Sequence, residues 1–293
     1  MIKRSRPSTA RVPPAVARVP ILGVGVSAVN LASAVEALEG WIQARQQTYV
    51  CVTPVHGIME CQRDPELRAI FNSSGLTTPD GMPLVWMLRA RGYPAVSRVY
   101  GPDLMLAVCR RSLARGWRHY LFGGRPGVAR RLAARLRRLF PGLRIVGAEA
   151  PPAEWRPGER SRRSVRRINS ARADLVWVGL STPKQERWMA LHRHDLRAPV
   201  LLGVGAAFDF LSGAKPQAPG WMQRSGLEWL FRLASEPARL WRRYLVDNPL
   251  FVILVLAEAI GWRREPVGGR PRPARKSGPG RRAGSGVLSS RRE

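Results

Sequence analysis

Several motifs of the 293-residue chain join a carboxylate or a cation to residues that favour turns. In the segment TTPDGMPLVWMLR (77–89), Asp80 lies in a Pro-Asp-Gly turn directly before an apolar stretch of helical pattern. A carboxylate held at a loop tip beside a cleft can take a proton from an incoming hydroxyl group. The same pattern is typical of a turn or a helix cap, so the motif alone leaves both interpretations open.

Two further turns carry groups that suit a phosphate. Arg98 and Asp103 flank a Gly-Pro turn, where Arg98 could grip a phosphate with two hydrogen bonds, or the two side chains could form a surface ion pair and a helix cap. Gly123 and Gly124 belong to the Gly-rich turn LFGGRPGVARR (121–131). Its backbone N–H groups and the following helix N-terminus could face an anion, although a tight structural turn explains the glycines equally well.

Polar residues also follow two other apolar runs. Lys184 and Gln185 come after a Ser-Thr-Pro turn at the end of an expected strand, where a ligand would lie. A helix cap accounts for the neighbouring Thr182 and Glu186 but leaves Lys184 and Gln185 unexplained. Asp209 stands among apolar residues just past another expected strand, and a buried carboxylate needs either structural hydrogen bonds or a ligand.

The pattern of apolar and polar residues around these motifs predicts an α/β fold. Short, nearly continuous apolar runs alternate with amphipathic stretches such as 127–140, whose Val and Leu residues share one helical face. This alternation predicts a parallel, Rossmann-like sheet flanked by helices, with ligands bound at the carboxyl ends of the strands. The expected strands are 48–54, 119–124, 143–148, 174–180 and 199–205, with a further strand or hairpin in 21–30.

The chain divides into four parts by composition. Residues 1–20 predict a disordered basic leader, and residues 21–217 the α/β catalytic domain. Residues 218–262 predict a helical appendage rich in Arg and Trp, made of two or three amphipathic helices broken at Pro237 and Pro249. Residues 263–293, rich in Gly, Pro, Arg and Ser, predict a disordered basic tail.

The appendage carries a cluster of cations. Arg232, Arg239, Arg242 and Arg243 fall close to one helical face and are interleaved with Trp residues, which is typical of a membrane-interface helix or of a solvated basic face. The apolar stretch 249–260 is too short to span a bilayer. The appendage is therefore expected to face the membrane and not to cross it.

The excess of basic over acidic residues limits the kinds of partner that the chain is expected to bind. Lys and Arg number 49 against 20 acidic residues, a formal net charge of +29, which predicts a polyanionic partner. An anionic membrane surface and phosphorylated substrates both fit. A nucleic-acid-binding protein is the main alternative, but no helix-turn-helix, zinc-finger or RRM signature supports a specific nucleic-acid partner. A nucleotide-dependent oxidoreductase is the second alternative, and the absence of GxGxxG from the chain counts against it.

The cysteines and histidines predict no metal site. Cys51, Cys61 and Cys109 are odd in number and show no CxxC spacing, which fits a reducing compartment. His56 follows the first buried run and could face the cleft, whereas His192 and His194 are too isolated for a metal centre. The chain also lacks a DxD motif.

Taken in order along the chain, these segments resemble the WecG/TagA/CpsF glycosyltransferase family. The resemblance runs from about Gly23 to about Leu256. It rests on TPDG, RVYGPDLM, FGGRPG, STPKQERW, GVGAAFDFLSG and PGWMQRSGLEWLFRLASEPARLWRRYL. It implies an inverting, metal-independent transferase without a cofactor, using a UDP-sugar donor and a sugar on a polyprenyl diphosphate as acceptor. Such an enzyme would be cytoplasmic and peripheral on the inner face of the plasma membrane.

The resemblance also implies roles for individual residues. Asp80 would be the general base, Thr53 and Arg98 would line its pocket with Arg98 near the diphosphate, and Gln185 would contact the donor. The arginines expected to reach the diphosphates are Arg232, Arg239 and Arg242.

One departure from the family pattern affects the substrate. Many members have Asn at the position of Val55, and here its polar contact is either lost or taken over by His56. The sugar therefore remains open among N-acetylmannosamine, its uronic acid, glucose and glucuronic acid. The oligomeric state is also open, a homo-oligomer included.

Overall fold

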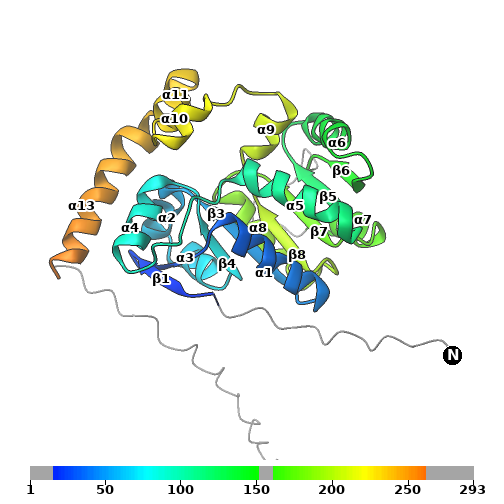
Figure 1. The fold of residues 1–293 in the computed structure, drawn as a ribbon, viewed down its shortest axis with the longest axis horizontal. Helices are drawn as coiled ribbons and strands as arrows, with labels where there is room; N and C mark the ends of the chain where they lie inside the picture. The colour runs from blue at the N-terminus through cyan, green and yellow to red at the C-terminus, as the bar shows by residue number, and fades with distance from the viewer. Residues whose placement is uncertain (1–15, 152–160, 262–293) are drawn as a thin grey trace, which may run out of the picture.

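A twisted parallel sheet forms the centre of the molecule (Figure 1). The computed structural model describes residues 16–151 and 161–261. Within these ranges, six parallel strands follow the order β4–β3–β8–β7–β5–β6. They are β3 (Thr48–Thr53), β4 (Leu76–Pro79), β5 (Arg118–Gly123), β6 (Arg144–Glu149), β7 (Leu175–Gly179) and β8 (Val200–Gly203). The predicted parallel α/β sheet is thus confirmed.

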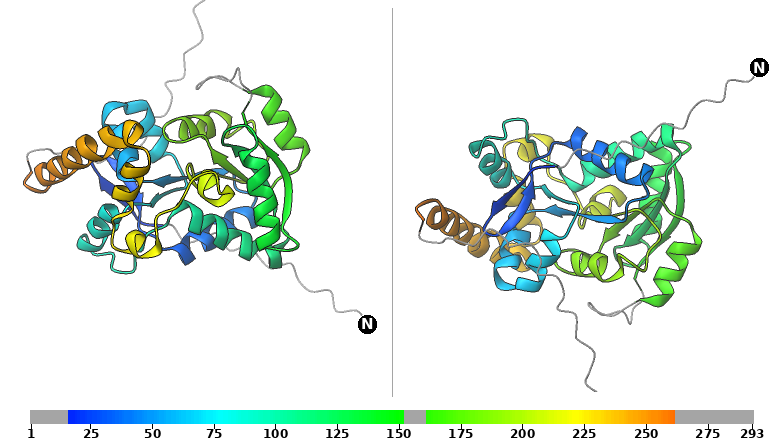
Figure 2. Two further views of the ribbon diagram at one scale, coloured as in Figure 1. Left: turned by 90° about the horizontal axis from the view of Figure 1, so that it is seen from above. Right: turned by 90° about the horizontal axis from the view of Figure 1, so that it is seen from below.

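Helices cover both faces of the sheet, so the inner strands bury side chains on either side (Figure 2). In β3, for example, Val50 and Val52 face one apolar cluster, and Tyr49 and Cys51 face the other. The first cluster is covered by α1 (Leu31–Gln43), α5 (Gly101–Arg115), α6 (Val128–Leu139) and α9 (Ala207–Ser212). The second is covered by α2 (Val55–Arg63), α3 (Pro65–Asn72), α4 (Met82–Ala90), α7 (Arg162–Ser170) and α8 (Lys184–His192).

The five apolar runs expected to be strands form β3, β5, β6, β7 and β8. The segment expected to be a strand or hairpin belongs to an antiparallel hairpin of β1 (Arg18–Ile21) and β2 (Val24–Ser27). The sequence reading missed β4, because its four residues, LTTP, include two Thr and end in the proline of the turn. The parallel register pairs Thr53 with Pro79, so β3 and β4 end side by side.

The C-terminal helices pack against the α2 side of the sheet. They are α10 (Gly220–Arg224), α11 (Glu228–Ser235), α12 (Pro237–Trp241), the π-helical turn η1 (Arg242–Asp247) and α13 (Asn248–Ala259). Phe251 of α13 is buried in the second apolar cluster, so this segment is anchored to the α/β core. No described helix is both long enough and apolar enough to cross a membrane.

The break predicted at Pro249 is wrong, whereas an interruption does precede Pro237. The helical path continues from residue 237 to residue 259 through η1. A proline inside a helix lacks the N–H donor, and its ring meets the carbonyl four residues earlier, here in η1. The wider π-helical turn is one of the ways in which a helix accommodates such a clash without ending.

The division into leader, catalytic domain, appendage and tail stays a prediction. Most of the expected leader (1–20) lies outside the described residues, and its last residues belong to β1. The expected tail (263–293) lies outside them entirely.

Candidate active site

Two adjoining pockets open beyond the carboxyl ends of the central strands. The first, here called the aromatic pocket, has a volume of about 210 Å³, and the second, the polar pocket, about 260 Å³. They share a wall formed by Pro54, His56, Asp80, Arg232 and Arg243. A carboxyl group on the wall between two pockets can act on ligands bound in either of them.

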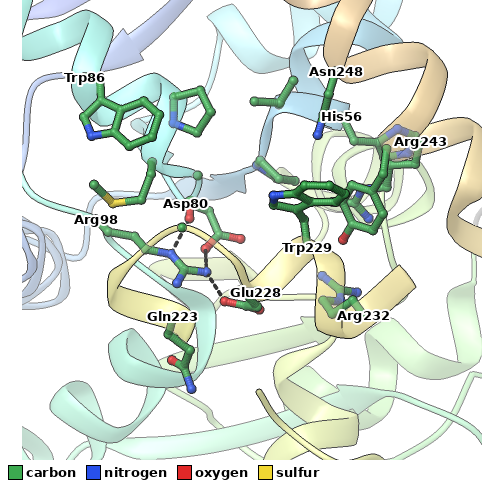
Figure 3. A pocket seen from close by; sticks show the side chains of 17 residues that line it. His56, Asp80, Trp86, Arg98, Gln223, Glu228, Trp229, Arg232, Arg243 and Asn248 are labelled. Atoms are coloured by element: carbon green, nitrogen blue, oxygen red, sulfur yellow. Dashed lines mark hydrogen bonds and ion pairs between the residues drawn. The ribbon is translucent and has the colours of Figure 1, made fainter. Parts of the chain in front are cut away.

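Different elements line the rest of each pocket. The aromatic pocket is completed by α4, the loop between α4 and α5, and the C-terminal helices, including Met82, Trp86, Arg98, Glu228, Trp229 and Tyr244 (Figure 3). The polar pocket is completed by the loops after β7 and β8 and the helices α8 and α9 that follow them, including Ser181, Thr182, Gln185, Gly205 and Asp209, and by Arg239 of α12. This is the edge at which parallel sheets bind their ligands.

Asp80 follows β4 directly, and its N–H donates to the carbonyl oxygen of Thr53 at 3.0 Å. Burial raises the pKa of the Asp80 carboxyl to about 6, against the opposing effect of the Arg98 guanidinium. A group with this pKa is mostly ionised at neutral pH and yet basic enough to take a proton. The position and proton affinity of Asp80 therefore suit a general base.

Arg98 lies against Asp80. Its Nε donates to the Asp80 carbonyl oxygen at 2.5 Å, and its Nη2 lies 3.5 Å from Asp80 Oδ1. The same Nη2 donates to Glu228 Oε2 at 2.7 Å. Burial acts to lower the pKa of Arg98, but the Asp80 and Glu228 carboxylates outweigh burial and raise it.

Thr53 contributes through its backbone. Its side chain is fully buried, lines neither pocket and donates to the Cys51 carbonyl oxygen at 2.9 Å. The Thr53 carbonyl oxygen fixes the start of the Asp80 turn, because it accepts the Asp80 N–H.

His56 lines both pockets and also contacts the C-terminal segment. Its Nδ1 lies 3.3 Å from Asp247 Oδ2. Burial, followed by the nearby Arg243 charge, lowers the pKa of His56. His56, Glu60 and Asp247 place ligand atoms within 4.8 Å of one another and could hold a metal ion. However, Arg63 pairs with both carboxylates, and its charge disfavours a second cation there.

Two hydrogen bonds fix the side-chain amide of Gln185. Its Oε1 accepts the Gly205 N–H at 3.0 Å, and its Nε2 donates to Glu186 Oε1 at 2.9 Å. Burial raises the pKa of Glu186 to about 7, although the hydrogen bond from Gln185 acts in the opposite direction. One Nε2 hydrogen remains for the polar pocket. The adjacent Lys184 is exposed and lines neither pocket.

The two predicted glycines lie outside both pockets. A Cβ on Gly123 would come within 2.6 Å of the Gly179 backbone, and one on Gly124 within 2.8 Å of Val128. Both glycines also have positive φ angles, 145° and 71°. Close packing at the end of β5 therefore accounts for them, which favours the tight-turn interpretation.

The two predicted carboxylates differ in position. Asp103 is exposed and lines neither pocket. Asp209 lines the polar pocket, with Oδ2 3.6 Å from the Lys215 Nζ.

The C-terminal arginines fall into three groups. Arg232 lines both pockets, whereas Arg239 lines the polar pocket and pairs with Glu236 through two hydrogen bonds of 2.7 and 2.8 Å. Arg242 is exposed, lies against the Trp241 ring and lines neither pocket. Arg243 lines both, and no ion pair to it is found among the described residues. Burial, and then repulsion from Arg232, lowers the pKa of Arg243.

Sequence reasoning named Arg243 in the cation cluster but not among the site residues, and it missed Glu228, Trp86 and Trp229. Helical periodicity could not separate Arg243 from Arg242, because η1 changes the rotation per residue. Nothing in the sequence signals that Glu228 meets Arg98, since 130 positions separate them.

Known proteins resemble this chain over most of its length. Residues 19–265 match the model of the Glycosyl transferase WecG/TagA/CpsF family. A protein of Bacillus spizizenii strain W23 is 32% identical over 197 residues, which is 67% of this chain and 74% of that protein. Another, of Bacillus subtilis strain 168, is 30% identical over 198 residues, with the same two shares. Both are named N-acetylglucosaminyldiphosphoundecaprenol N-acetyl-beta-D-mannosaminyltransferase.

Proposed function

The chain belongs to the WecG/TagA/CpsF family of glycosyltransferases, and from this membership we propose a specific reaction. The enzyme transfers N-acetylmannosamine from its UDP derivative to a sugar carried on a polyprenyl diphosphate, in the synthesis of a cell-surface polymer. The two relatives, whose name specifies N-acetylmannosamine and a diphosphoundecaprenol-linked N-acetylglucosamine, support this choice. The observation that carries the proposal is the place of Asp80 on the wall between two pockets.

In the proposed step, an acceptor hydroxyl oxygen attacks the anomeric carbon of the donor sugar. The bond between that carbon and the UDP oxygen breaks, UDP leaves with the electron pair, and the Asp80 carboxylate takes the hydroxyl proton. Attack from the face opposite UDP inverts the anomeric configuration. The raised pKa of Asp80, about 6, allows it to accept the proton at neutral pH.

The polar pocket is the proposed donor site. The remaining Gln185 N–H can donate to a sugar or phosphate oxygen. Arg239 lines this pocket, but its guanidinium is paired with Glu236. Arg232 and Arg243 line it too and can stabilise the charge that develops on the leaving diphosphate. These cations perform the task that a metal ion performs in other transferases, which supports the metal-independent mechanism.

The aromatic pocket is the proposed acceptor site. Trp86 and Trp229 present apolar ring faces and an indole N–H, a combination suited to the mixed apolar and polar surface of a sugar. The Asp80 carboxyl lines the same pocket, so a bound acceptor hydroxyl can reach the base.

Peripheral attachment to the inner face of the plasma membrane is part of the proposal. On the surface of η1, α13 and the C-cap residue of α13, five large apolar side chains are more than half exposed: Leu245, Val252, Ile253, Leu256 and Ile260. Apolar burial in the interface and attraction of Arg to anionic lipids, about 1 kcal/mol per cation, favour binding. We expect the full chain to float with anionic liposomes at low salt. Protein that stays at the bottom of the gradient while the liposomes float would overturn the membrane assignment.

The function is tested by transfer assays with a panel of UDP-sugars and an undecaprenyl-diphosphate-linked N-acetylglucosamine acceptor, with and without EDTA. We expect UDP release and a disaccharide product, greatest with UDP-N-acetylmannosamine and unaffected by EDTA. Preference for UDP-glucose or a uronic acid would correct the sugar alone. Absence of UDP-sugar binding and of product would refute the proposed reaction.

A further inference from the structure

We propose that Glu228 is a positioning residue that keeps Arg98 from neutralising Asp80, so that the base is competent only with α11 docked on the α/β core. The proposal rests on the proposed transfer reaction. It concerns a residue that does not itself need to touch either substrate.

Glu228 lies on the first turn of α11, yet both of its carboxylate oxygens are bound to the α/β core. Oε2 accepts from Arg98 Nη2 at 2.7 Å, and Oε1 accepts from the Tyr100 hydroxyl at 3.0 Å. Only 7% of Glu228 is exposed. A carboxylate so far removed from water requires such partners, and here they join the C-terminal helices to the segment that follows Asp80.

The distances show how Arg98 divides its charge. Its Nη2 is 2.7 Å from Glu228 but 3.5 Å from the Asp80 carboxylate. The guanidinium is further fixed by the Asp80 carbonyl oxygen and by the Tyr100 ring, whose centroid lies 4.1 Å from Arg98 Cζ. Figure 3 shows the guanidinium between the two carboxylates.

The closer contact to Glu228 leaves the Asp80 oxygens less engaged and able to receive a proton. Without the Glu228 charge, Arg98 would pair with Asp80 alone. A close cation stabilises the ionised carboxylate and makes it a weaker base. The negative charge of Glu228 itself acts on Asp80 in the opposite direction, raising its pKa.

A second consequence concerns the phosphates. Asp80, Arg98 and Glu228 together carry one net negative charge when all three are ionised, so Arg98 is a poor holder of a diphosphate. Arg232 and Arg243 line both pockets and are better placed for that role. The role that the family resemblance suggested for Arg98 thus moves to the C-terminal arginines.

The test compares the wild-type chain with Glu228→Gln, which keeps the shape of the side chain and removes its charge. Two readouts are measured: the pH dependence of kcat/KM, and the Asp80 carboxyl titration by NMR of ¹³C-labelled aspartate. We expect the acid limb and the NMR titration both to move to lower pH. We also expect kcat at neutral pH to fall about tenfold, because a weaker base transfers the proton less well, with an unchanged KM for the UDP-sugar.

Two variants serve as controls. Glu258→Gln removes a different ion pair between the C-terminal helices and the core, with Arg91 at 3.3 Å, and should leave the Asp80 titration unmoved. Tyr100→Phe removes one hydrogen bond to Glu228 but keeps its charge and its contact with Arg98, so it should leave the Asp80 titration close to that of the wild type. Thermal unfolding by circular dichroism verifies that each variant is folded.

The outcomes separate this inference from the proposed function. If the wild type transfers sugar and Glu228→Gln leaves both the acid limb and the NMR titration in place, the inference is wrong and the function stands. If the wild type transfers nothing but the Asp80 titration still falls in Glu228→Gln, the reaction is wrong and the positioning role stands. If Glu228→Gln is unfolded, the test uses Glu228→Asp, whose shorter side chain withdraws the carboxylate from Arg98. We expect a smaller shift of the Asp80 titration to lower pH, and an unmoved titration would overturn the inference.

Discussion

The polar and aromatic pockets meet at Asp80 but are built from different parts of the chain. The polar pocket consists largely of loops that follow β7 and β8, with arginines added from the C-terminal helices. The aromatic pocket is formed by α4 on one side and by α11 and η1 on the other. In the proposed reaction, donor recognition therefore depends mainly on the sheet, whereas acceptor recognition depends on how the C-terminal helices dock.

Two arginines that line these pockets, Arg98 and Arg243, differ in whether a carboxylate pairs with them. Arg98, near the floor of the aromatic pocket, is engaged by two carboxylates. Arg243, on the shared wall, is paired with no carboxylate of the described residues. A half-buried guanidinium without an acidic partner favours an anionic ligand, whereas one already paired contributes mainly to geometry.

The largest predicted effect is at Asp80, because the transfer step between the two pockets depends on this one carboxyl group. We expect Asp80→Asn to lower kcat by about 10²–10⁴-fold, the usual contribution of a placed base. Because the folded-state pKa of Asp80 is raised to about 6, its ionised form destabilises the fold above its ordinary pKa. The neutral amide should therefore keep or raise Tm at pH 7. Near-normal turnover would remove Asp80 from the mechanism.

The second-largest effect is expected for Arg243→Ala, which removes a guanidinium proposed to bind the diphosphate of UDP. Loss of a charge-assisted hydrogen bond of about 1.5–3 kcal/mol predicts a tenfold to hundredfold weaker UDP affinity by calorimetry. Arg138→Ala is the matched control, because Arg138 is exposed on α6 and lines neither pocket. Equal losses in both variants would mean that net charge alone matters.

The smallest effect is expected at Trp86, which is 56% exposed and so contributes little to folding. Trp86→Ala should raise the KM of the lipid-linked acceptor about twofold to tenfold, in line with the energy of an aromatic contact. The KM of the UDP-sugar should stay unchanged. A rise in the donor KM alone would reverse the assignment of the two pockets.

The sequence predicted the parts of the site that depend on strand ends. Gln185 was expected at the ligand edge because turn residues after apolar runs in a parallel sheet collect there, whereas Asp80 was singled out by its Pro-Asp-Gly turn. The glycines after β5 were ambiguous, since a tight turn and a phosphate cradle need the same residue type. The close contacts that a Cβ would make at Gly123 and Gly124 favour the tight turn.

The parts that escaped sequence reasoning depend on tertiary packing. The choice between Arg242 and Arg243 depends on η1, because a helix of constant pitch does not predict the local change in rotation. The Glu228–Arg98 contact joins two elements far apart in the chain, and no local pattern reports it. Strand β4 is only four residues long, too short for a periodic signal.

The most direct test of the account is calorimetry of Asp80→Asn with both substrates, because this variant should bind them without converting them. The account predicts that UDP-N-acetylmannosamine and the lipid-linked acceptor each bind with near wild-type Kd. It also predicts that the acceptor still binds when the donor is saturating, because the two ligands occupy separate pockets. Competition between donor and acceptor for one site would contradict the account.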